Sequence, residues 1–152
     1  MGKEVSTHNM INDMLASGKR VVVPYCKENC NELGIAEIRD TEKDLTKGEY
    51  GILEPRVELR DLFLKSDLRL VVCPGVAFDI YGARLGRGKA YYDAFLREFK
   101  ERIPITGLAF DCQISKEHLP FDYHDIAMDQ IITESGLLIK KTLQSSSEVP
   151  AG

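Results

Sequence analysis

The chain has 152 residues, a length that predicts one domain. Its composition, 43% hydrophobic and 29% charged, is typical of a globular fold with a real core. The net charge of −4 excludes a general basic field for nucleic acid, and no apolar run is long enough to span a bilayer. Neither nucleic acid nor a membrane is therefore expected as a partner.

The amino-terminal half predicts one helix and two strands, followed by irregular chain. Ser6 or Thr7 can cap a helix that runs to about Ser17. The two strands are a β-branched run and an alternating run, at residues 20–26 and 32–39. Charged and proline-containing sequence then predicts turns and irregular structure, at residues 40–47 and 48–56.

The carboxyl-terminal half alternates strands with helices. The predicted strands are short apolar runs, at residues 67–75, 104–110 and 130–133. Two helices are expected, one from about residue 88 to residue 100 and one that opens at Ser135 or Gly136. The first has apolar side chains at i, i+3, i+4 and i+7: Tyr92, Phe95, Leu96 and Phe99. These elements predict a single domain over residues 1–143 and a flexible tail over 144–152.

Helices that alternate with short apolar strands predict an α/β fold. The expected form is a three-layer, open, mostly parallel sheet with helices on both faces, of the Rossmann-like kind. In such sheets ligands bind beyond the carboxyl ends of the strands. The segment that follows the strand at 67–75 is therefore the first candidate for a site.

That segment, PGVAFDIYGARLGRGKAYYDAFL at residues 74–96, gathers glycines, cations and tyrosines at a strand-to-helix junction. Glycine lets the backbone approach an anion, and the first N–H groups of a helix can bind one. Arg84, Arg87 and Lys89 can clamp phosphate. A polyphosphate site is predicted, and a glycine-rich connection with solvated basic residues is the alternative that these residues alone leave open.

The segment does not match the standard nucleotide loops. A P-loop would need glycine at position 83 and Ser or Thr at position 90, but both are alanine. The dinucleotide pattern would need glycine where Tyr91 stands. Asp93, four residues after Lys89, is either its ion-pair partner or a ligand of Mg²⁺. Tyr91 lies at the edge of the apolar stripe and can contact a flat ligand.

The cysteines and histidines carry no recognisable metal pattern. Cys26 and Cys30 form one CxxxC pair, with no second pair of Cys or His at zinc spacing. The three histidines are scattered and are expected at the surface: His8, His118 and His124. A reduced, cytoplasmic setting is the simplest interpretation.

Residues 74–96 closely resemble the signature of the 5-formyltetrahydrofolate cyclo-ligase family, whose members are also called methenyltetrahydrofolate synthetases. Three more segments resemble the family in the same order: EVSTHNMINDMLASGKRVVVP, YGILEP and HDIAMDQIIT. The resemblance covers roughly residues 3–135. It implies a layout shared with sugar-phosphate isomerases and CoA transferases. It also implies the ATP- and Mg²⁺-dependent closure of 5-formyltetrahydrofolate to 5,10-methenyltetrahydrofolate, with release of ADP and phosphate.

The resemblance also implies roles for individual residues. Lys89 and Arg87 would act in catalysis on the phosphates of ATP. The ATP-binding stretch would be a continuous run: Arg84, Leu85, Gly86, Arg87, Gly88, Lys89, Ala90, Tyr91 and Tyr92. Folate would contact Glu4 and Tyr91, with Tyr50 as a further candidate for an aromatic wall, and Mg²⁺ would be held by Asp93 and Asp129.

Two departures from the family pattern bear on activity. Ala90 stands where the family usually has glycine, which costs about 1 kcal/mol if that residue needs a positive φ and nothing if it is helical. Family members usually carry about fifty more residues at the amino end, with cations that reach ATP and a strand of the sheet. An exposed edge in place of that strand would favour a homodimer over a monomer. Besides an active enzyme, a folate- or nucleotide-binding remnant without turnover and an unrelated α/β domain are the alternatives.

Overall fold

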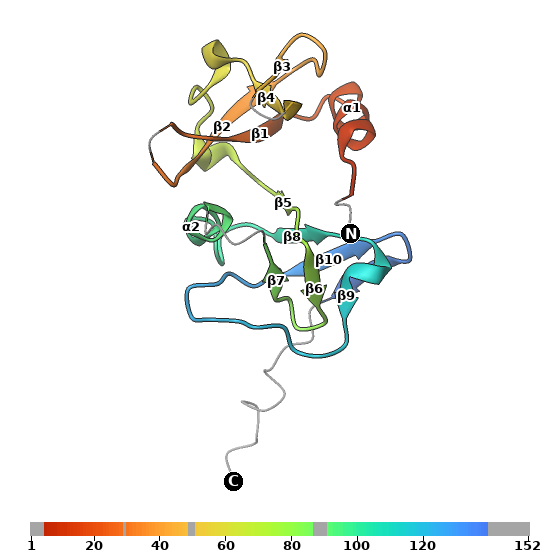
Figure 1. Cartoon of the computed structure of the whole chain (residues 1–152). Coiled ribbons are helices and arrows are strands. Elements are labelled where there is room, and N and C mark those ends of the chain that lie inside the picture. The colour runs from red at the N-terminus through yellow and green to blue at the C-terminus, as the bar shows by residue number, and fades with distance from the viewer. Residues whose placement is uncertain (1–4, 29, 49–50, 87–90, 140–152) are drawn as a thin grey trace. The chain divides into compact units, whose positions relative to one another are not determined.

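The structure is a computed structural model that describes residues 5–28, 30–48, 51–86 and 91–139 (Figure 1). The chain forms two compact units, Ser6–Leu68 and Arg69–Gly152, the latter with Met1–Val5. The single domain over residues 1–143 stays a prediction. The predicted tail at 144–152 lies outside the described residues. Within the described part of the chain, no helix has the length and apolar character needed to cross a membrane.

The unit Ser6–Leu68 opens with one helix and a hairpin: α1 His8–Ala16, β1 Val21–Cys26 and β2 Leu33–Ile38. The predicted helix is confirmed, because it starts after Thr7 and ends before Gly18, which has a φ of +83°. β1 and β2 pair antiparallel with Tyr25 opposite Gly34, and the Tyr25 ring fills the space that a side chain at position 34 would need. The two predicted strands are thus correct, but they do not join a parallel sheet.

A second hairpin follows, where irregular chain was predicted. It consists of β3 Leu45–Lys47 and β4 Leu53–Pro55, paired antiparallel, and two 3₁₀ turns complete the unit at Val57–Leu59 and Lys65–Asp67. The Asp44 carboxylate accepts hydrogen bonds from the backbone N–H groups of Arg39 and Asp40, which fixes the turn before β3. Proline is tolerated at the end of β4 because the sheet has only two strands. The prediction was wrong because such short strands carry little periodicity.

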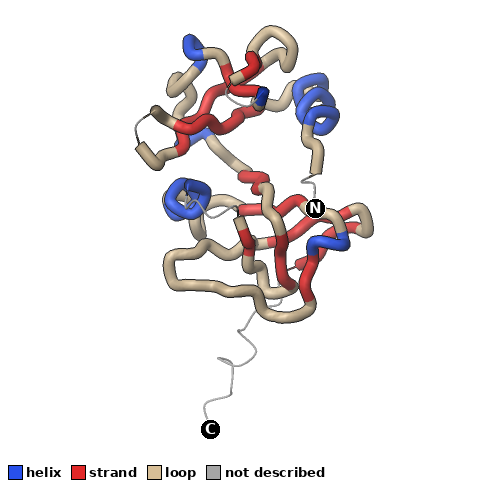
Figure 2. The backbone as a smooth tube through the Cα atoms, in the orientation of Figure 1, coloured by secondary structure: helices blue, strands red, loops and turns tan. Residues whose placement is uncertain are grey.

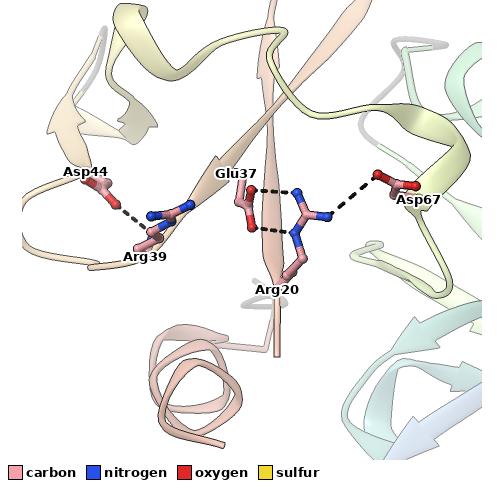
Figure 3. Close-up of polar contacts among 5 residues, drawn as sticks. All are labelled: Arg20, Glu37, Arg39, Asp44 and Asp67. Carbon is pink, nitrogen blue, oxygen red and sulfur yellow. Dashed lines mark hydrogen bonds and ion pairs between the residues drawn. The ribbon is translucent and has the colours of Figure 1, made fainter. Parts of the chain in front are cut away.

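Arg20, just before β1, connects separate parts of this unit (Figure 3). Its Nε and Nη2 donate to the Glu37 carboxylate at 2.8 and 2.9 Å, and Asp67 lies 3.7 Å from Nη1. The guanidinium carbon also lies 4.7 Å from the centre of the Phe63 ring. The hydrogen bond from Arg20 holds the pKa of Glu37 below its ordinary value.

Tyr25 belongs to a partly buried polar cluster in the same unit. Its hydroxyl group is hydrogen-bonded to the Asp61 carboxylate, and the Arg60 guanidinium carbon lies 4.4 Å from its ring centre. Asp61 has a φ of +60°, an uncommon conformation for a residue other than glycine. Burial and the hydrogen bond to Asp61 raise the pKa of Tyr25 to about 12.

We expect Tyr25→Phe to reduce the loss of stability at high pH. The folded pKa of Tyr25 lies above its ordinary value of 10.0, so its contribution is complete below pH 10 and is lost as the pH rises to 12. Free energies of unfolding from urea titrations across this range measure the effect. Tyr123→Phe is the control, because that side chain is 86% exposed. Equal pH slopes for the two variants would contradict the assignment.

The unit that begins at Arg69 holds the remaining elements of the chain: β5 Val71–Cys73, β6 Ala77–Asp79, β7 Arg84–Leu85, α2 Tyr91–Arg97, β8 Ile105–Leu108, β9 Ile114–Ser115, β10 Gln130–Thr133 and β11 Gly136–Ile139. The main sheet has the order β11-β10-β8-β5. β5, β8 and β10 are parallel, and β11 is antiparallel to β10. The three predicted strands are confirmed, and the chain is α/β with mixed sheets.

The closing helix predicted from Ser135 or Gly136 is wrong over the described residues. Residues Gly136–Ile139 form β11, joined to β10 by a two-residue loop, with Thr133 opposite Gly136. Gly136 has a φ of +124°, which suits the end of a tight hairpin loop rather than the start of a helix. A short apolar run after a glycine fits both a helix and a strand, and pairing with β10 decides for the strand.

Phe78 joins the main sheet to a smaller one, β7-β6-β9. Its ring is fully buried, and a Cβ added to Gly75 or Gly107 would lie only 2.8 or 2.6 Å from it. The two glycines therefore admit the ring between the turn after β5 and the middle of β8. α2 ends at Arg97 rather than near residue 100, and its predicted stripe is confirmed at Phe95 and Leu96, which are buried. Phe99 is also buried but lies in the turn after the helix.

Candidate functional site

The glycine segment follows the carboxyl end of β5, as predicted, but part of it is a small sheet rather than a loop. β6 and β7 pair antiparallel around Gly82, which has a φ of +94°, and β9 pairs parallel with β6. This arrangement places Arg84 on β7 and Gly86 just beyond it. The sequence analysis missed these strands because they are only two or three residues long.

Arg84 is held by the turn that leaves β5. Its Nη1 donates to the Pro74 carbonyl at 3.1 Å, and its guanidinium carbon lies 5.1 Å from the centre of the Tyr92 ring. A Cβ on Gly75 would lie 3.0 Å from its Cγ, and one on Gly86 would lie 3.1 Å from Nη1. Its Nε is buried and has no hydrogen-bond partner among the residues that the structure describes. A buried cationic donor of this kind fits a site for an oxygen-rich anion.

Asp79 organises the hairpin that carries Arg84. The residue is 1% exposed, and its carboxylate accepts hydrogen bonds from the backbone N–H groups of Tyr81, Ala83 and Leu119, each at 2.9 Å. The first two bonds fix the β6–β7 turn, and the third attaches that turn to a segment 40 residues away. Backbone donors thus stabilise this buried carboxylate and define the shape of the loop.

Gln113 fixes the start of the glycine segment, at the turn between β5 and β6. Its side-chain nitrogen donates to the carbonyls of Gly75 and Val76 at 2.9 and 3.1 Å, and its oxygen accepts from the Phe110 N–H at 2.9 Å. The carbonyls of Pro74, Gly75 and Val76 are therefore all bound by side chains, the first by Arg84. These side-chain contacts fix the turn between β5 and β6, together with the backbone bond from the Val76 N–H to the Leu85 carbonyl at 2.8 Å.

The two aspartates proposed for Mg²⁺ are connected through one short segment. Asp93 accepts a hydrogen bond from the Ile126 N–H at 3.2 Å, and Asp129 accepts one from the Ile105 N–H at 2.8 Å. Three extended residues span at most about 10 Å, so Ile126 and Asp129 lie no farther apart than that. Each bond uses one carboxylate oxygen. In the described parts of the chain no group of three or more His, Cys, Asp or Glu side chains could hold a metal ion.

Mg²⁺ commonly takes one or two carboxylates and completes its shell with water and substrate phosphates. Asp93 and Asp129 are therefore a chemically suitable donor pair, provided that a phosphate supplies further oxygens. Their joint coordination of one ion stays a prediction. Asp129 comes immediately before β10, so it lies at the amino ends of the parallel strands, whereas Arg84 follows the carboxyl end of β5.

The described residues also form a pocket of about 280 Å³ at the amino ends of these strands. Its lining residues are Lys100, Glu101, Ile105, Phe121, Tyr123, Asp125, Ala127 and Asp129. Most of them belong to the long loop between β9 and β10, drawn in tan in Figure 2. Since carboxylates outnumber the single lysine, the pocket by itself favours a cation over a phosphate. The Arg84 region therefore remains the candidate for an anion site.

Cys73 is the last residue of β5, where the charges of Arg84 and Asp93 both act on its thiol. Burial raises the pKa of its thiol to about 12, with a lowering effect from Arg84 and a raising effect from Asp93. Both charged groups therefore act on the carboxyl end of β5. Cys26, Cys30 and Cys112 are exposed, and none of the four cysteines forms a disulfide in the structure.

We expect a thiol reagent to label three cysteines rapidly in the native protein and Cys73 only after unfolding. A buried, protonated thiol is a poor nucleophile, whereas the exposed thiols are accessible. Labelling followed by mass spectrometry, with and without urea, measures the number of modified thiols. Cys73→Ala is the matched control and should leave no slowly reacting thiol. Rapid labelling of Cys73 in the folded protein would contradict its burial.

Several residues named by the sequence analysis lie outside the described residues: Glu4, Tyr50, Arg87, Gly88, Lys89 and Ala90. Of the others, Arg84, Gly86 and Tyr92 are brought together, and Leu85 follows Arg84 on β7 with 41% of its surface exposed. Tyr91 is half-buried at the start of α2. The structure therefore assembles the arginine end of the predicted ATP-binding stretch.

A model of the 5-formyltetrahydrofolate cyclo-ligase family matches residues 1–134. This chain belongs to that family. It is 34% identical to the 5-formyltetrahydrofolate cyclo-ligase of Mus musculus over 142 residues, which cover 88% of this chain and 70% of the mouse protein. It is 32% identical to the Escherichia coli K12 protein of the same name over 133 residues, which cover 87% of this chain and 72% of that protein.

Solved structures of related proteins agree with this membership. The 5,10-methenyltetrahydrofolate synthetase of Aquifex aeolicus, solved by NMR, superposes with a TM-score of 0.72 at 32% sequence identity. The match covers 91% of this chain and 67% of the Aquifex chain. The resemblance drawn from residues 74–96 is thus confirmed at the level of the cyclo-ligase family.

The sequence analysis missed two residues that shape the candidate site, Asp79 and Gln113. Asp79 lies within the quoted segment, and an aspartate two to four residues before a glycine is a common turn signal that could have identified it. Gln113 lies outside the segment, and nothing in its immediate neighbourhood predicts that its amide binds the turn at Gly75. Both became visible only through contacts between distant parts of the chain.

Proposed function

We propose that this chain catalyses the ATP- and Mg²⁺-dependent cyclisation of 5-formyltetrahydrofolate to 5,10-methenyltetrahydrofolate, with release of ADP and phosphate. The observation that carries the proposal is the family match over residues 1–134, which includes the whole glycine segment. The geometry at Arg84, a cationic side chain with a buried donor beside Gly75 and Gly86, supports an anion site in that segment.

The reaction explains why a phosphate site is needed. The oxygen of a formamide is a poor leaving group, so ring closure by the folate N10 requires that this oxygen be activated. Transfer of the γ-phosphoryl group of ATP to the formyl oxygen releases ADP. Attack by N10 on the formyl carbon then expels phosphate, and the proton lost from N10 is taken up by the departing phosphate. The protein has to hold the γ-phosphate and the formyl oxygen in line and neutralise charge.

Arg84 would bind phosphate oxygens through the edge of its guanidinium group that carries Nε, while Pro74 and Tyr92 keep the group in place. Lys89 and Arg87 would supply the further cations. Leu85, Gly86, Gly88, Ala90, Tyr91 and Tyr92 complete the proposed ATP-binding stretch, and Glu4, Tyr50 and Tyr91 are proposed for folate. No general base is required for the activation step.

Asp93 and Asp129 are the residues that would hold Mg²⁺. The bound ion would neutralise charge on the transferring phosphoryl group. The hydrogen bonds from Ile126 and Ile105 would orient the two carboxylates before any ion binds. Removal of either carboxylate should therefore raise the Mg²⁺ concentration needed for half-maximal turnover.

The proposal includes a finer description of the protein. The parallel order β5-β8-β10 supports a three-layer, Rossmann-like sheet covered on both faces, of the kind shared with sugar-phosphate isomerases. The proposed setting is the cytoplasm, and the partners are reduced folate and ATP, with neither nucleic acid nor membrane. A monomer and a homodimer are both compatible with these contacts.

The test mixes the purified 152-residue chain with 5-formyltetrahydrofolate, ATP and Mg²⁺. Methenyltetrahydrofolate is followed by its absorbance, and phosphate is assayed in parallel. We expect product only when ATP is present, with one phosphate released for each folate closed. Folded protein that binds ATP but forms no product would reject the enzymatic proposal and support a binding remnant of the family.

A further inference from the structure

We infer that Gln113 is a positioning residue for the nucleotide site, acting through the Pro74–Val76 turn on Arg84. The inference rests on the proposed function and assigns a further residue to that site. Gln113 lies at the end of a 3₁₀ turn, Asp111–Gln113, outside the glycine segment and 29 residues beyond Arg84 along the chain. Its role follows from the contacts of its side-chain amide.

The orientation of the Gln113 amide is defined by its partners. The side chain is buried, with 6% of its surface exposed. Its nitrogen faces two carbonyl oxygens, those of Gly75 and Val76, and its oxygen faces the N–H group of Phe110. A reversed amide would set its oxygen against two carbonyl oxygens and its nitrogen against a donor. The amide therefore fits in one orientation and uses both of its donor hydrogens on the turn.

Contacts on each side of Gly75 link this turn to Arg84. The Pro74 carbonyl accepts the hydrogen bond from Arg84 Nη1 at 3.1 Å. The Val76 N–H donates to the carbonyl of Leu85, the neighbour of Arg84, at 2.8 Å. Gly75 itself packs on the aliphatic part of Arg84, since a Cβ there would lie 3.0 Å from Cγ. Movement of the turn would therefore move the guanidinium group.

Because β5 is short, the carbonyl groups that follow it need hydrogen-bond donors from another part of the chain. β5 ends at Cys73, so the carbonyls of Gly75 and Val76 lie beyond its ladder with β8. Gln113 provides donors to these two carbonyls and thereby fixes the direction of the chain as it leaves the sheet. Misplacement of a binding group by about 1 Å can cost roughly 100-fold in rate, so a fixed turn matters for the proposed phosphoryl transfer.

A double-mutant cycle tests whether Gln113 acts through Arg84. Gln113→Ala should lower kcat/KM for ATP by roughly 10- to 100-fold and leave KM for the folate unchanged. In an Arg84→Ala background, the same substitution should have little further effect, because its target is already gone. Equal effects of Gln113→Ala in both backgrounds would overturn the inference.

Gln130→Ala is the matched control, since its amide donates one hydrogen bond, to Thr106 Oγ1 at 2.9 Å, within the main sheet. This variant should keep the wild-type KM for ATP, and an equal rise in that KM would overturn the inference by showing that any lost amide suffices. Gln113→Met keeps the volume of the side chain without its donors and replaces Gln113→Ala if that variant does not fold. Urea titrations verify folding in each case.

Calorimetric titration with ATP, without folate, separates this inference from the proposed function. If the wild type binds ATP but makes no methenyltetrahydrofolate, the proposed function fails, and weaker ATP binding by the Gln113 variants would still support the inference. If the Gln113 variants bind ATP as tightly as the wild type, the inference fails even when the wild type is fully active. Absence of ATP binding by folded wild type would overturn both.

Discussion

Lys89→Ala should reduce product formation to the limit of detection while leaving the fold intact. Removal of one preorganised donor to a developing charge typically lowers the rate by about 10²- to 10³-fold, and the proposed site has to neutralise a transferring phosphoryl group. Lys89 follows directly on Gly88 in the family signature and is the proposed contact to the phosphates. Steady-state rates over a range of ATP concentrations measure the loss, and calorimetry measures the weaker ATP binding.

Lys116→Ala is the control for this substitution. Lys116 is an exposed lysine of the same unit, located just after β9, and it has no part in the proposed site. Its removal should change neither turnover nor ATP affinity. Unchanged turnover of Lys89→Ala, in a protein that unfolds at the wild-type urea concentration, would show that the phosphate contact is assigned to the wrong residue.

Asp79→Ala should lower the free energy of unfolding by about 3 to 5 kcal/mol, because it leaves one buried and two partly buried N–H groups without an acceptor. Asp79→Asn should cost less, about 1 to 3 kcal/mol, since one side-chain oxygen can still accept from Tyr81 and Ala83 and only the bond from Leu119 is lost. Urea titrations of both variants measure these differences.

The comparison that isolates burial is Asp122→Ala, because Asp122 is an exposed aspartate of the same unit. Its removal should change the free energy of unfolding by less than about 0.5 kcal/mol. A stability of Asp79→Ala close to that of Asp122→Ala would mean that the three backbone donors find water or other acceptors. In that case the hairpin would not depend on the Asp79 carboxylate.

Burial of apolar side chains made part of this fold predictable. β8 and β10 coincide with apolar runs, and the i, i+3, i+4 spacing of Tyr92, Phe95 and Leu96 identified α2. These signals are local in sequence. The strands that they predict then pair with one another in the main sheet, as their apolar pattern requires. The α/β class followed from them, and so did the expectation of a site after β5.

The hairpins were not predictable in the same way. The unpredicted strands have two to four residues, and their conformation is decided by the partner strand and not by their own pattern: β3, β4, β6, β7 and β11. Gly136 illustrates the ambiguity, because a glycine before an apolar run fits a helix start and a hairpin loop equally well. Pairing of Ile132 with Leu137 settles the outcome.

The candidate site also has a part that the sequence could predict and a part that it could not. Arg84 could be proposed from its cluster of glycines and cations, because these residue types together suit anion binding. The partners that hold it could not be identified, since Asp79 meets Leu119 across 40 residues and Gln113 meets Gly75 across 38. A single sequence contains the chemical groups but not the pairing of distant groups.

These long-range hydrogen bonds have a consequence for biosynthesis. The glycine segment is translated well before Gln113 and Leu119, and the loops that must close are long enough for their entropy to oppose early contact. A nascent chain that ends before Gln113 would contain every proposed phosphate ligand of the segment, yet lack both Gln113 and Leu119, whose hydrogen bonds shape it. We therefore expect nucleotide binding to arise in the last stage of folding, after the carboxyl-terminal part of the sheet has been added.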